Sequence, residues 1–526
     1  MNEERSRLRV DLLLGIVCFL VALSAVVFTL GDPGLAWDEP AYLGAGANIL
    51  AHLSARLSSA PSDVPDPWDR ASAHPVFGKL LVAAALAAFE PVFGDYLLAG
   101  RMVGALSYAG IALLLFVCLS RRSGRTAGAW AAALWIAHPR IFGHAHFAAL
   151  DMMLAFFFLA TAVAFVFERG SRLAGLFSGI LWGLALGVKV NAIILPVFLI
   201  PLAFLSDGRR AWRQVLPFVV VGVGVFLLLF LPMWLDGPRQ ILQYLTGGAL
   251  RAVEGIGPVR TEVPVFYMGR VFRGNAPWHY YPVMLLAVSP VIFVVLAAGG
   301  AVRAVRRRRN ELALLFVCAA AVALGAALAG PFPKYDGVRL ILYAFPFLAG
   351  LAGIGGEAAV ALLRRRGSRA VASAAVVAAL AAQIVVFHPY ELSYYSAAVG
   401  WLRGAHRLGF EITYWLETND AKLFGFLNRQ TPPGAKVAFY PVEAAAVRFF
   451  YEPGFLRDDI EVVEIGATDT VADLRARGVA VVVIANRRSF LAGTALASSL
   501  EGLSPIFYNT VPVLGDVPLS AVYRID

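Results

Sequence analysis

Residues 11–42 read DLLLGIVCFLVALSAVVFTLGDPGLAWDEPAY, a long apolar run followed within a few residues by an acidic pair. A helix needs about 20 apolar residues to span a bilayer, so residues 11–30 are predicted to be a membrane span. Asp38 and Glu39 then lie near the membrane boundary, where a carboxylate is costly and marks a functional site by default. The alternative is a solvated loop with interfacial aromatic residues around it. This stretch alone leaves both interpretations open.

The composition of the whole chain is that of a protein with many membrane spans. Its 526 residues are 59% hydrophobic and 15% charged, and the mean hydropathy is +0.71. A soluble globular chain does not need so much apolar surface. The first apolar run is too long for a typical signal-peptide core, and no clear cleavage site follows it, so we expect it to be retained as a span.

The formal charge of +10 is explained by topology rather than by a nucleic-acid partner. Arginines cluster between the apolar runs, in the pattern by which basic loops stay on the cytoplasmic side of a membrane. We therefore expect no nucleic acid to bind. The clusters lie at residues 121–125, 169–172, 209–213, 303–309 and 364–369.

With these loops held inside, the apolar runs give about eleven spans, a cytoplasmic N-terminus and an extracytoplasmic C-terminus in an inner or plasma membrane. Two external segments are predicted, at residues 31–96 and 236–277. Within the first, residues 76–93 are predicted to lie in the interface, because a further span there would turn the arginine loops outward. The predicted spans are residues 11–30, 97–119, 127–142, 151–167, 173–188, 191–205, 215–235, 281–302, 312–329, 340–363 and 370–387.

The character of the chain changes after residue 388. We expect residues 1–388 to form the membrane module and residues 389–526 to form a small extracytoplasmic α/β domain. Short runs rich in β-formers alternate there with helical patterns, which indicates a partly parallel sheet. The predicted strands are residues 436–440, 460–465, 479–485 and 521–525, and the predicted helices are residues 471–477 and 490–500.

Polar residues of the membrane module gather at the predicted external ends of the spans. An acidic pair there can supply a general base, and histidines near Asp151 can bind a metal or orient it. Cations on the same face can hold a phosphate by charge-assisted hydrogen bonds. The residues that carry this pattern are Asp38, Glu39, His74, Lys79, Arg101, His138, Arg140, His144, His146, Asp151, Lys189, Lys334, Asp336 and Arg339.

Several of these residues lie in short motifs that resemble one family. Residues 74–79, HPVFGK, are similar to the H-P-P-L-G-K pattern of protein O-mannosyltransferases, and residues 183–189, GLALGVK, resemble a G-L-A-x-x-x-K turn. Residues 334–339, KYDGVR, resemble a late loop before a span, and residues 388–395, HPYELSYY, resemble the segment after the last span of bacterial members. Together with the acidic pair, these motifs resemble the membrane-embedded GT-C glycosyltransferases, including the aminoarabinose and related polyprenyl-phosphate-dependent transferases.

The resemblance implies a GT-C-like fold and an inverting transfer of a sugar from a polyprenyl-phosphate donor, on the extracytoplasmic face. Asp38 would be the general base, Glu39 its partner in donor or metal binding, and Asp151 the second acid. The resemblance implies no certain cofactor. A candidate divalent-metal site would use Glu39, His144, His146 and Asp151, and the candidate substrate-binding residues are His74, Lys79, Arg101, Lys189, Lys334 and Arg339.

The implied partners are the lipid-linked sugar, membrane lipids and an acceptor that is a protein, a lipid or a glycan. The W-W-D-Y-G signature of oligosaccharyltransferases is missing from the sequence, which disfavours that branch. The main alternative is a transporter or lipid flippase without transferase activity. Transporters usually show two related halves with sites at the membrane midplane. Here the ionisable residues gather at one predicted interface, which favours the enzyme. A non-catalytic scaffold would leave the polar cluster without a common purpose.

Overall fold

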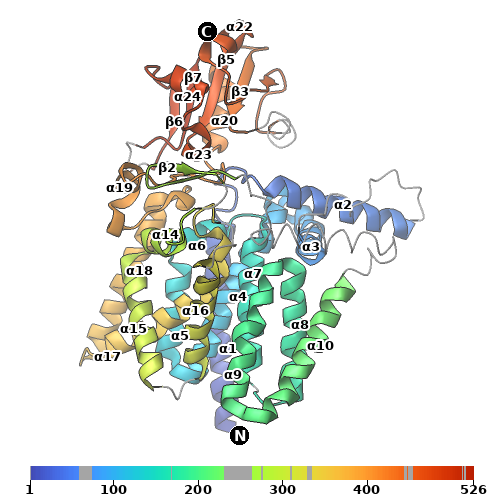
Figure 1. Ribbon diagram of the computed structural model, residues 1–526, viewed down its shortest axis with the longest axis vertical. Coiled ribbons are helices and arrows are strands. Elements are labelled where there is room, and N and C mark those ends of the chain that lie inside the picture. Colours follow the sequence, from blue (N-terminus) through green and yellow to red (C-terminus); the bar gives the residue numbers. More distant parts are fainter. Residues whose placement is uncertain are drawn as a thin grey trace.

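The computed structural model describes residues 2–58, 74–167, 169–229, 263–273, 276–307, 311–328, 334–442, 447, 454–511, 513 and 517–525. Figure 1 shows a bundle of helices with the N-terminus at one end and a small sheet domain, which carries the C-terminus, beyond the other. We call the latter the domain end of the bundle. Arg251 and Arg260, predicted in the second external segment, lie outside the described residues.

Each of the predicted spans overlaps a helix of the bundle. The helices are α1 (Asn2–Val27), α4 (Tyr96–Ser123), α5 (Arg125–Ile136), α7 (Leu150–Phe167), α8 (Arg172–Val188), α9 (Leu195–Asp207), α10 (Trp212–Leu229), α14 (Tyr280–Val288), α15 (Val291–Arg307), α16 (Glu311–Leu328), α17 (Phe345–Ala361) and α18 (Arg366–Phe387). Among the described residues, seven helices are long and apolar enough to cross a membrane, or eight if α14 and α15, bent by 117°, form one span. The count of about eleven therefore stays a prediction.

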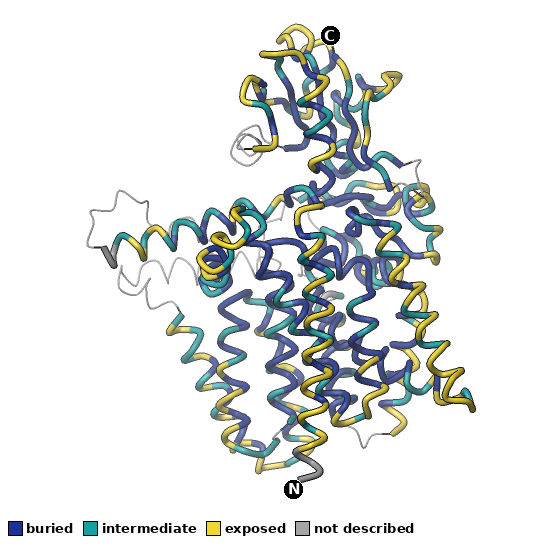
Figure 2. Tube along the Cα trace, turned by 180° about the vertical axis from the view of Figure 1, so that it is seen from behind, coloured by how far each residue is buried: buried dark blue, intermediate teal, exposed yellow. Residues whose placement is uncertain are grey.

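The outside of the bundle is apolar as well as the inside. Large hydrophobic side chains on its outer helices are exposed, for example Leu13 on α1, Phe177 on α8 and Leu228 on α10. Exposed stretches run along the outer helices in Figure 2, while the inner ones are buried. A surface of this kind is stable in contact with lipid rather than water, so the chain is a multi-pass membrane protein.

Two helices lie across the bundle at its domain end. In Figure 1, α2 (Glu39–Ser58) runs across the bundle axis rather than along it, and α3 (Val76–Phe93) is seen nearly end-on. Length and composition alone would let α3 span a membrane. Its direction instead fits the prediction that residues 76–93 lie in the interface. The fold thus leaves the domain end of the bundle covered by helices that follow the loop of Asp38.

Short elements connect the helices at this end and at the opposite one. A hairpin of β1 (Val265–Tyr267) and β2 (Arg270–Phe272) pairs antiparallel, and its two turn residues, Met268 and Gly269, both have positive φ. That turn geometry suits the twist of a two-residue hairpin. The other short elements are α6 (Pro139–His144), η2 (Val190–Ile194), η3 (Gly208–Ala211), η5 (Arg339–Ala344), η6 (Glu391–Ser393), η7 (Ala397–Val399) and α19 (Trp401–Arg407).

The C-terminal domain is built on a five-stranded mixed sheet, which confirms the predicted α/β domain. The strand order is β4-β3-β5-β7-β6, with parallel pairing in β4-β3-β5 and antiparallel pairing beyond β5. The strands are β3 (Lys436–Tyr440), β4 (Glu461–Val463), β5 (Val479–Ala485), β6 (Phe507–Asn509) and β7 (Ser520–Arg524), and the helices are α20 (Ala421–Gln430), α22 (Val471–Ala476), α23 (Arg488–Leu491) and α24 (Ala495–Leu500).

Alternating side chains of β5 bury both faces of this sheet. Val481 and Val483 pack in the hydrophobic cluster that includes α20, whereas Val482 and Ile484 pack in the cluster that includes α22 and α24. Successive residues of a strand point to opposite faces, so an almost continuous apolar run is what a sheet covered on both sides requires.

The C-terminal domain is joined to the loop that carries the acidic pair. The backbone N–H of Gly34 donates to the carbonyl of Glu417 at 2.8 Å, and the N–H of Trp37 donates to that of Trp415 at 2.9 Å. Because the acidic pair follows directly, this contact fixes where its two side chains can lie.

The two ends of the bundle allow the predicted orientation of the chain in the membrane to be tested. Alkaline phosphatase fused after Asp526 should be active, because that enzyme matures outside the cytoplasm and the positive-inside pattern places this end there. The control is the same fusion after Arg307, at the end of α15 within a basic cluster, which should be inactive. Activity in the control and not in the full-length fusion would reverse the predicted topology.

Candidate active site

The site residues are brought together because each stands at a helix end on the domain side of the bundle. Asp38 directly precedes α2, and Asp151 lies in the first turn of α7. Lys189 separates α8 from η2, and Arg339 begins η5. Helix ends expose polar groups without breaking a hydrophobic helix interior, so ionisable side chains concentrate where the apolar runs stop.

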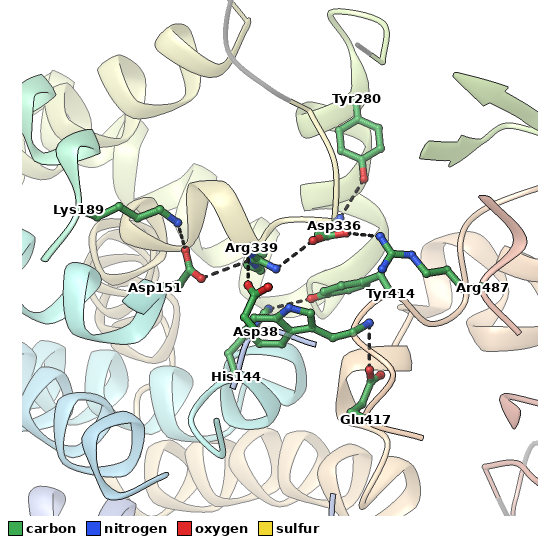
Figure 3. Close-up of polar contacts among 12 residues, drawn as sticks. Asp38, His144, Asp151, Lys189, Tyr280, Asp336, Arg339, Tyr414, Glu417 and Arg487 are labelled. Carbon is green, nitrogen blue, oxygen red and sulfur yellow. Dashed lines mark hydrogen bonds and ion pairs between the residues drawn. The ribbon is translucent and has the colours of Figure 1, made fainter. Parts of the chain in front are cut away.

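The Arg339 guanidinium is the centre of the site. Its Nη2 lies 2.7 Å from Oδ2 of Asp38, its Nη1 lies 2.9 Å from Oδ2 of Asp336, and its Nε lies 3.3 Å from Oδ2 of Asp151. Figure 3 shows the three carboxylates converging on it from different segments. The guanidinium carbon also lies 4.6 Å from the ring centroid of Trp415, a distance at which a cation is attracted to the ring face. Four segments distant in sequence therefore meet at one side chain.

Two further cations flank this group. Lys189 Nζ lies 2.6 Å from Oδ1 of Asp151, and Nη2 of Arg487 lies 2.9 Å from Oδ1 of Asp336. Positive and negative groups thus alternate from Lys189 to Arg487, and the charges of three cations and three carboxylates balance. We call these six residues, which include Asp38 and Arg339, the ion-pair cluster.

The carboxylates of the ion-pair cluster differ in access. The Asp38 side chain is 25% exposed, against 6% for Asp151 and 7% for Asp336. Buried charges need several partners to offset their desolvation, and the two buried acids each have two cations within reach. Asp38 is therefore the carboxylate of the cluster that a substrate can approach with least rearrangement.

Asp336 is held in a strained backbone conformation. Its φ is +52°, in the left-handed region that residues other than glycine seldom adopt, and Gly337 follows with φ +64°. The Gly337 N–H donates to the hydroxyl of Tyr280 at 2.9 Å. Burial raises the pKa of Asp336, while the charges of Arg487 and Arg339 act to lower it. Such strain is retained where the surrounding contacts fix a functional geometry.

Glu39 and Arg101 form a fully buried ion pair that is separate from the ion-pair cluster. All five N–H groups of Arg101 are used, two toward the Glu39 carboxylate and three toward backbone carbonyls, and the pair is 0% exposed. Glu39 also accepts the backbone N–H groups of Ala36 and Ala148, each at 2.9 Å. In this arrangement Arg101 has no N–H group left for a phosphate, so its predicted role as a phosphate ligand has no support in the geometry. The Glu39 carboxylate is engaged by Arg101 and by two backbone N–H groups of neighbouring loops, and its predicted role in donor or metal binding stays a prediction.

The four predicted metal ligands are not brought together. Among the described residues, no group of three or more His, Cys, Asp or Glu side chains is arranged to hold a metal ion. His144 Nε2 lies 2.9 Å from the hydroxyl of Tyr414, and the two ring nitrogens of His146 lie near Thr29 Oγ1 and the Phe142 carbonyl. Asp151 and Glu39 already face cations. Each candidate ligand is engaged elsewhere, so the predicted metal site has no structural support.

His74 and Lys79 lie beside the ion-pair cluster rather than in it. Lys79 Nζ donates to the His74 carbonyl at 2.9 Å. Burial, and after it the positive charges of Lys189 and Lys79, lower the pKa of His74 to about 3, so its ring is neutral near pH 7. Lys334 is buried at the start of the loop that leads to Asp336. The role of these three residues in substrate binding stays a prediction.

Two members of the site, Arg487 and Trp415, were not predicted from the sequence, and Asp336 was noted among the external polar residues without a role of its own. A signal for Arg487 exists, because it comes two residues after the buried strand β5, and the carboxyl ends of parallel strands are where polar sites gather. Nothing in the sequence around Trp415 marks it as the ring beneath Arg339.

Comparisons with known proteins identify the fold and the class of enzyme. Residues 75–331 match the family model of glycosyltransferase family 87, a stretch that includes Asp151 and Lys189. The fold matches that of ArnT from Cupriavidus metallidurans in the apo state, with a TM-score of 0.52 and 15% identity over 97% of this chain and 98% of that one. The chain is a membrane glycosyltransferase of the GT-C fold.

Two further solved structures have a similar fold. ArnT from the same organism bound to undecaprenyl phosphate matches with a TM-score of 0.51 and 15% identity, over 97% of this chain and 98% of that one. The archaeal oligosaccharyltransferase AglB from Archaeoglobus fulgidus, in complex with an inhibitory peptide and a dolichol-phosphate, matches at 0.49 and 12% identity, over 97% and 76% of the two chains. None of the curated protein sequences compared with the chain matches it. The predicted resemblance to GT-C enzymes and to aminoarabinose transferases is confirmed.

Proposed function

We propose that this glycosyltransferase moves a sugar from a polyprenyl-phosphate donor to an acceptor hydroxyl, with Asp38 as the general base. The observation that carries the proposal is the pairing of Asp38, the most exposed acid of the ion-pair cluster, with Arg339. The proposed base and the proposed phosphate-binding cation are then in direct contact, 2.7 Å apart. ArnT of Cupriavidus metallidurans, whose fold this chain shares, has been solved with undecaprenyl phosphate, which supports a lipid-phosphate donor.

The transfer needs one base and a place for the leaving phosphate. The acceptor oxygen forms a bond to the anomeric carbon of the sugar, and the bond from that carbon to the phosphate oxygen breaks. Asp38 takes the proton of the acceptor hydroxyl, and the phosphate leaves with the bonding electron pair as polyprenyl phosphate. Phosphate is a stable leaving group, so cations that neutralise its charge supply much of the assistance. A single displacement of this kind inverts the anomeric centre.

The cations of the ion-pair cluster supply that assistance in this proposal. A phosphate offers oxygens that match the planar fork of an arginine, which makes Arg339 the first candidate, with Lys189 beside it. The phosphate would compete with Asp38 for the same guanidinium, which now lies 2.7 Å from the carboxylate. Donor binding would therefore release Asp38 from its ion pair and leave it a stronger base when the acceptor arrives.

Asp151 and Asp336 act as positioning residues in this scheme. Both are buried, and each bridges Arg339 to a second cation, so they fix the guanidinium from two sides. The acceptor contributes a hydroxyl, which a protein, a lipid or a glycan can supply.

Donor binding tests the proposed phosphate site. Arg339→Lys keeps the positive charge and removes the planar fork, so affinity for a polyprenyl phosphate should fall about 10- to 100-fold, since hydrogen bonds to charged groups contribute about 1.5–3 kcal/mol. The measurement is equilibrium binding of radiolabelled polyprenyl phosphate to purified protein. The matched control is Arg303→Lys, whose guanidinium pairs with Glu357 at 3.2 Å far from the cluster. A folded Arg339→Lys protein with unchanged affinity would remove Arg339 from the phosphate site.

A further inference from the structure

A charged recess lies away from the ion-pair cluster, at the opposite end of the bundle. It is enclosed by the C-terminal ends of α4 and α15, the start of α16 and the side of α17, and has a volume of about 1020 Å³. In Figure 1 these helix ends lie toward the N-terminus. The arginines of the recess are Arg121, Arg122, Arg303, Arg306 and Arg307.

The rim of this recess carries an excess of positive charge. Five arginines face two glutamates, and both glutamates are already paired. Glu357 lies 3.2 Å from Arg303, and Glu311 lies 2.7 Å from Arg169, which is outside the recess. Arg306 and Arg307, in the last turn of α15, make no ion pair with a carboxylate in the part of the chain that the structure describes. An anion entering the recess would meet arginines without having to displace an acid.

The floor of the recess is apolar. Ala304, Ala313 and Ile354 are 3%, 2% and 5% exposed and belong to three different helices. Arginines at helix C-termini are common, because they complement the helix dipole and keep loops on one side of a membrane. Neither reason requires them to surround a cavity with a buried apolar floor. A basic rim over an apolar floor matches a molecule that is anionic at one end and hydrocarbon at the other.

We propose that this recess binds an anionic phospholipid, with the headgroup phosphate held by Arg306 and Arg307 and the glycerol end of the acyl chains against the apolar floor. Arginine holds a phosphodiester through two parallel N–H groups, and basic pockets between membrane helices are known to take such headgroups. A free phosphate ion would use the rim and leave the floor uncovered. This lipid site is separate from the ion-pair cluster, and the proposal does not depend on the proposed donor chemistry.

The test measures which lipids the purified full-length chain retains. Protein is reconstituted in nanodiscs of phosphatidylcholine with increasing phosphatidylglycerol, extracted, and analysed by native mass spectrometry. The wild type should retain phosphatidylglycerol at least tenfold over phosphatidylcholine, and Arg306→Gln/Arg307→Gln should lose most of this preference. Both side chains are exposed, so the fold should tolerate the change. The control is Arg209→Gln/Arg210→Gln, an exposed adjacent pair in η3 outside the recess.

The possible outcomes distinguish a specific lipid site from non-specific attraction of anionic lipids to basic residues. An equal loss in both double variants, or equal retention of the two lipids by the wild type, would overturn the proposal. Millimolar inorganic phosphate is added in a competing arm. If it displaced phosphatidylglycerol completely, the recess would be an anion site for the phosphate alone, which would also overturn the lipid assignment. Retention that resists phosphate and fails selectively in the Arg306 and Arg307 variant supports it.

Discussion

Asp38→Asn should lower the turnover of sugar transfer by about 10²- to 10⁴-fold, the range that a positioned general base contributes. The substitution keeps the shape of the side chain and removes its charge and its capacity to accept a proton. Arg339 keeps Asp151 and Asp336 as partners, so the fold should survive. Because Asn no longer competes for the guanidinium, donor affinity should be unchanged or higher. The loss should therefore appear in kcat and not in the KM for donor.

The measurement is transfer from a radiolabelled polyprenyl-phosphate sugar by purified Asp38→Asn protein, with donor binding measured in parallel. The matched control is Asp32→Asn in the same loop, where the side chain is 52% exposed and pairs with His388 rather than with the ion-pair cluster. That variant should keep its turnover within a few-fold of wild type. If Asp38→Asn did the same, the base would have to be sought elsewhere, and Asp151 would be the next candidate.

The fold could be predicted where hydrophobic pattern dominates. In the C-terminal domain the predicted strands 436–440 and 479–485 match β3 and β5, because short apolar runs rich in β-branched or aromatic residues favour a buried strand. The strand β6, only three residues long, was missed. The helix predicted at 490–500 is broken in two at Gly493, whose φ is +77°. Short elements and single left-handed residues leave too little pattern to detect.

The site could be predicted as a region but not as a set of contacts. The place where apolar runs stop marked Asp38, Asp151, Lys189 and Arg339, and the structure brings these four together. Sequence position cannot say which cation each acid meets. Asp38 and Glu39 are neighbours, yet successive residues at a helix start point about 100° apart, so one faces the cluster and the other the interior. The partner of Glu39 lies 62 residues away, in the second turn of the long helix α4.

Because Glu39, unlike Asp38, belongs to a fully buried ion pair, its substitution should have a large effect on the stability of the protein. Glu39→Gln should destabilise the protein by about 3–5 kcal/mol, the cost of breaking a buried ion pair by changing one partner, because it leaves the Arg101 charge uncompensated. Arg101→Leu should cost a comparable amount, since the carbonyls of Leu30, Pro33 and Gly34 also lose their donor. Both variants should unfold at a markedly lower temperature in detergent.

Thermal unfolding followed by size-exclusion chromatography measures the loss, with Glu357→Gln as the control. Glu357 and Arg303 form an ion pair whose side chains are 28% and 30% exposed. Pairs in contact with solvent contribute about 0–1 kcal/mol to stability. The Glu39→Gln protein that remains folded at low temperature should still transfer sugar within a few-fold of wild type, because Glu39 holds the loop and does not touch the reacting groups. A Glu39→Gln variant as stable as wild type but inactive would contradict this role and return Glu39 to the catalytic site beside Asp38.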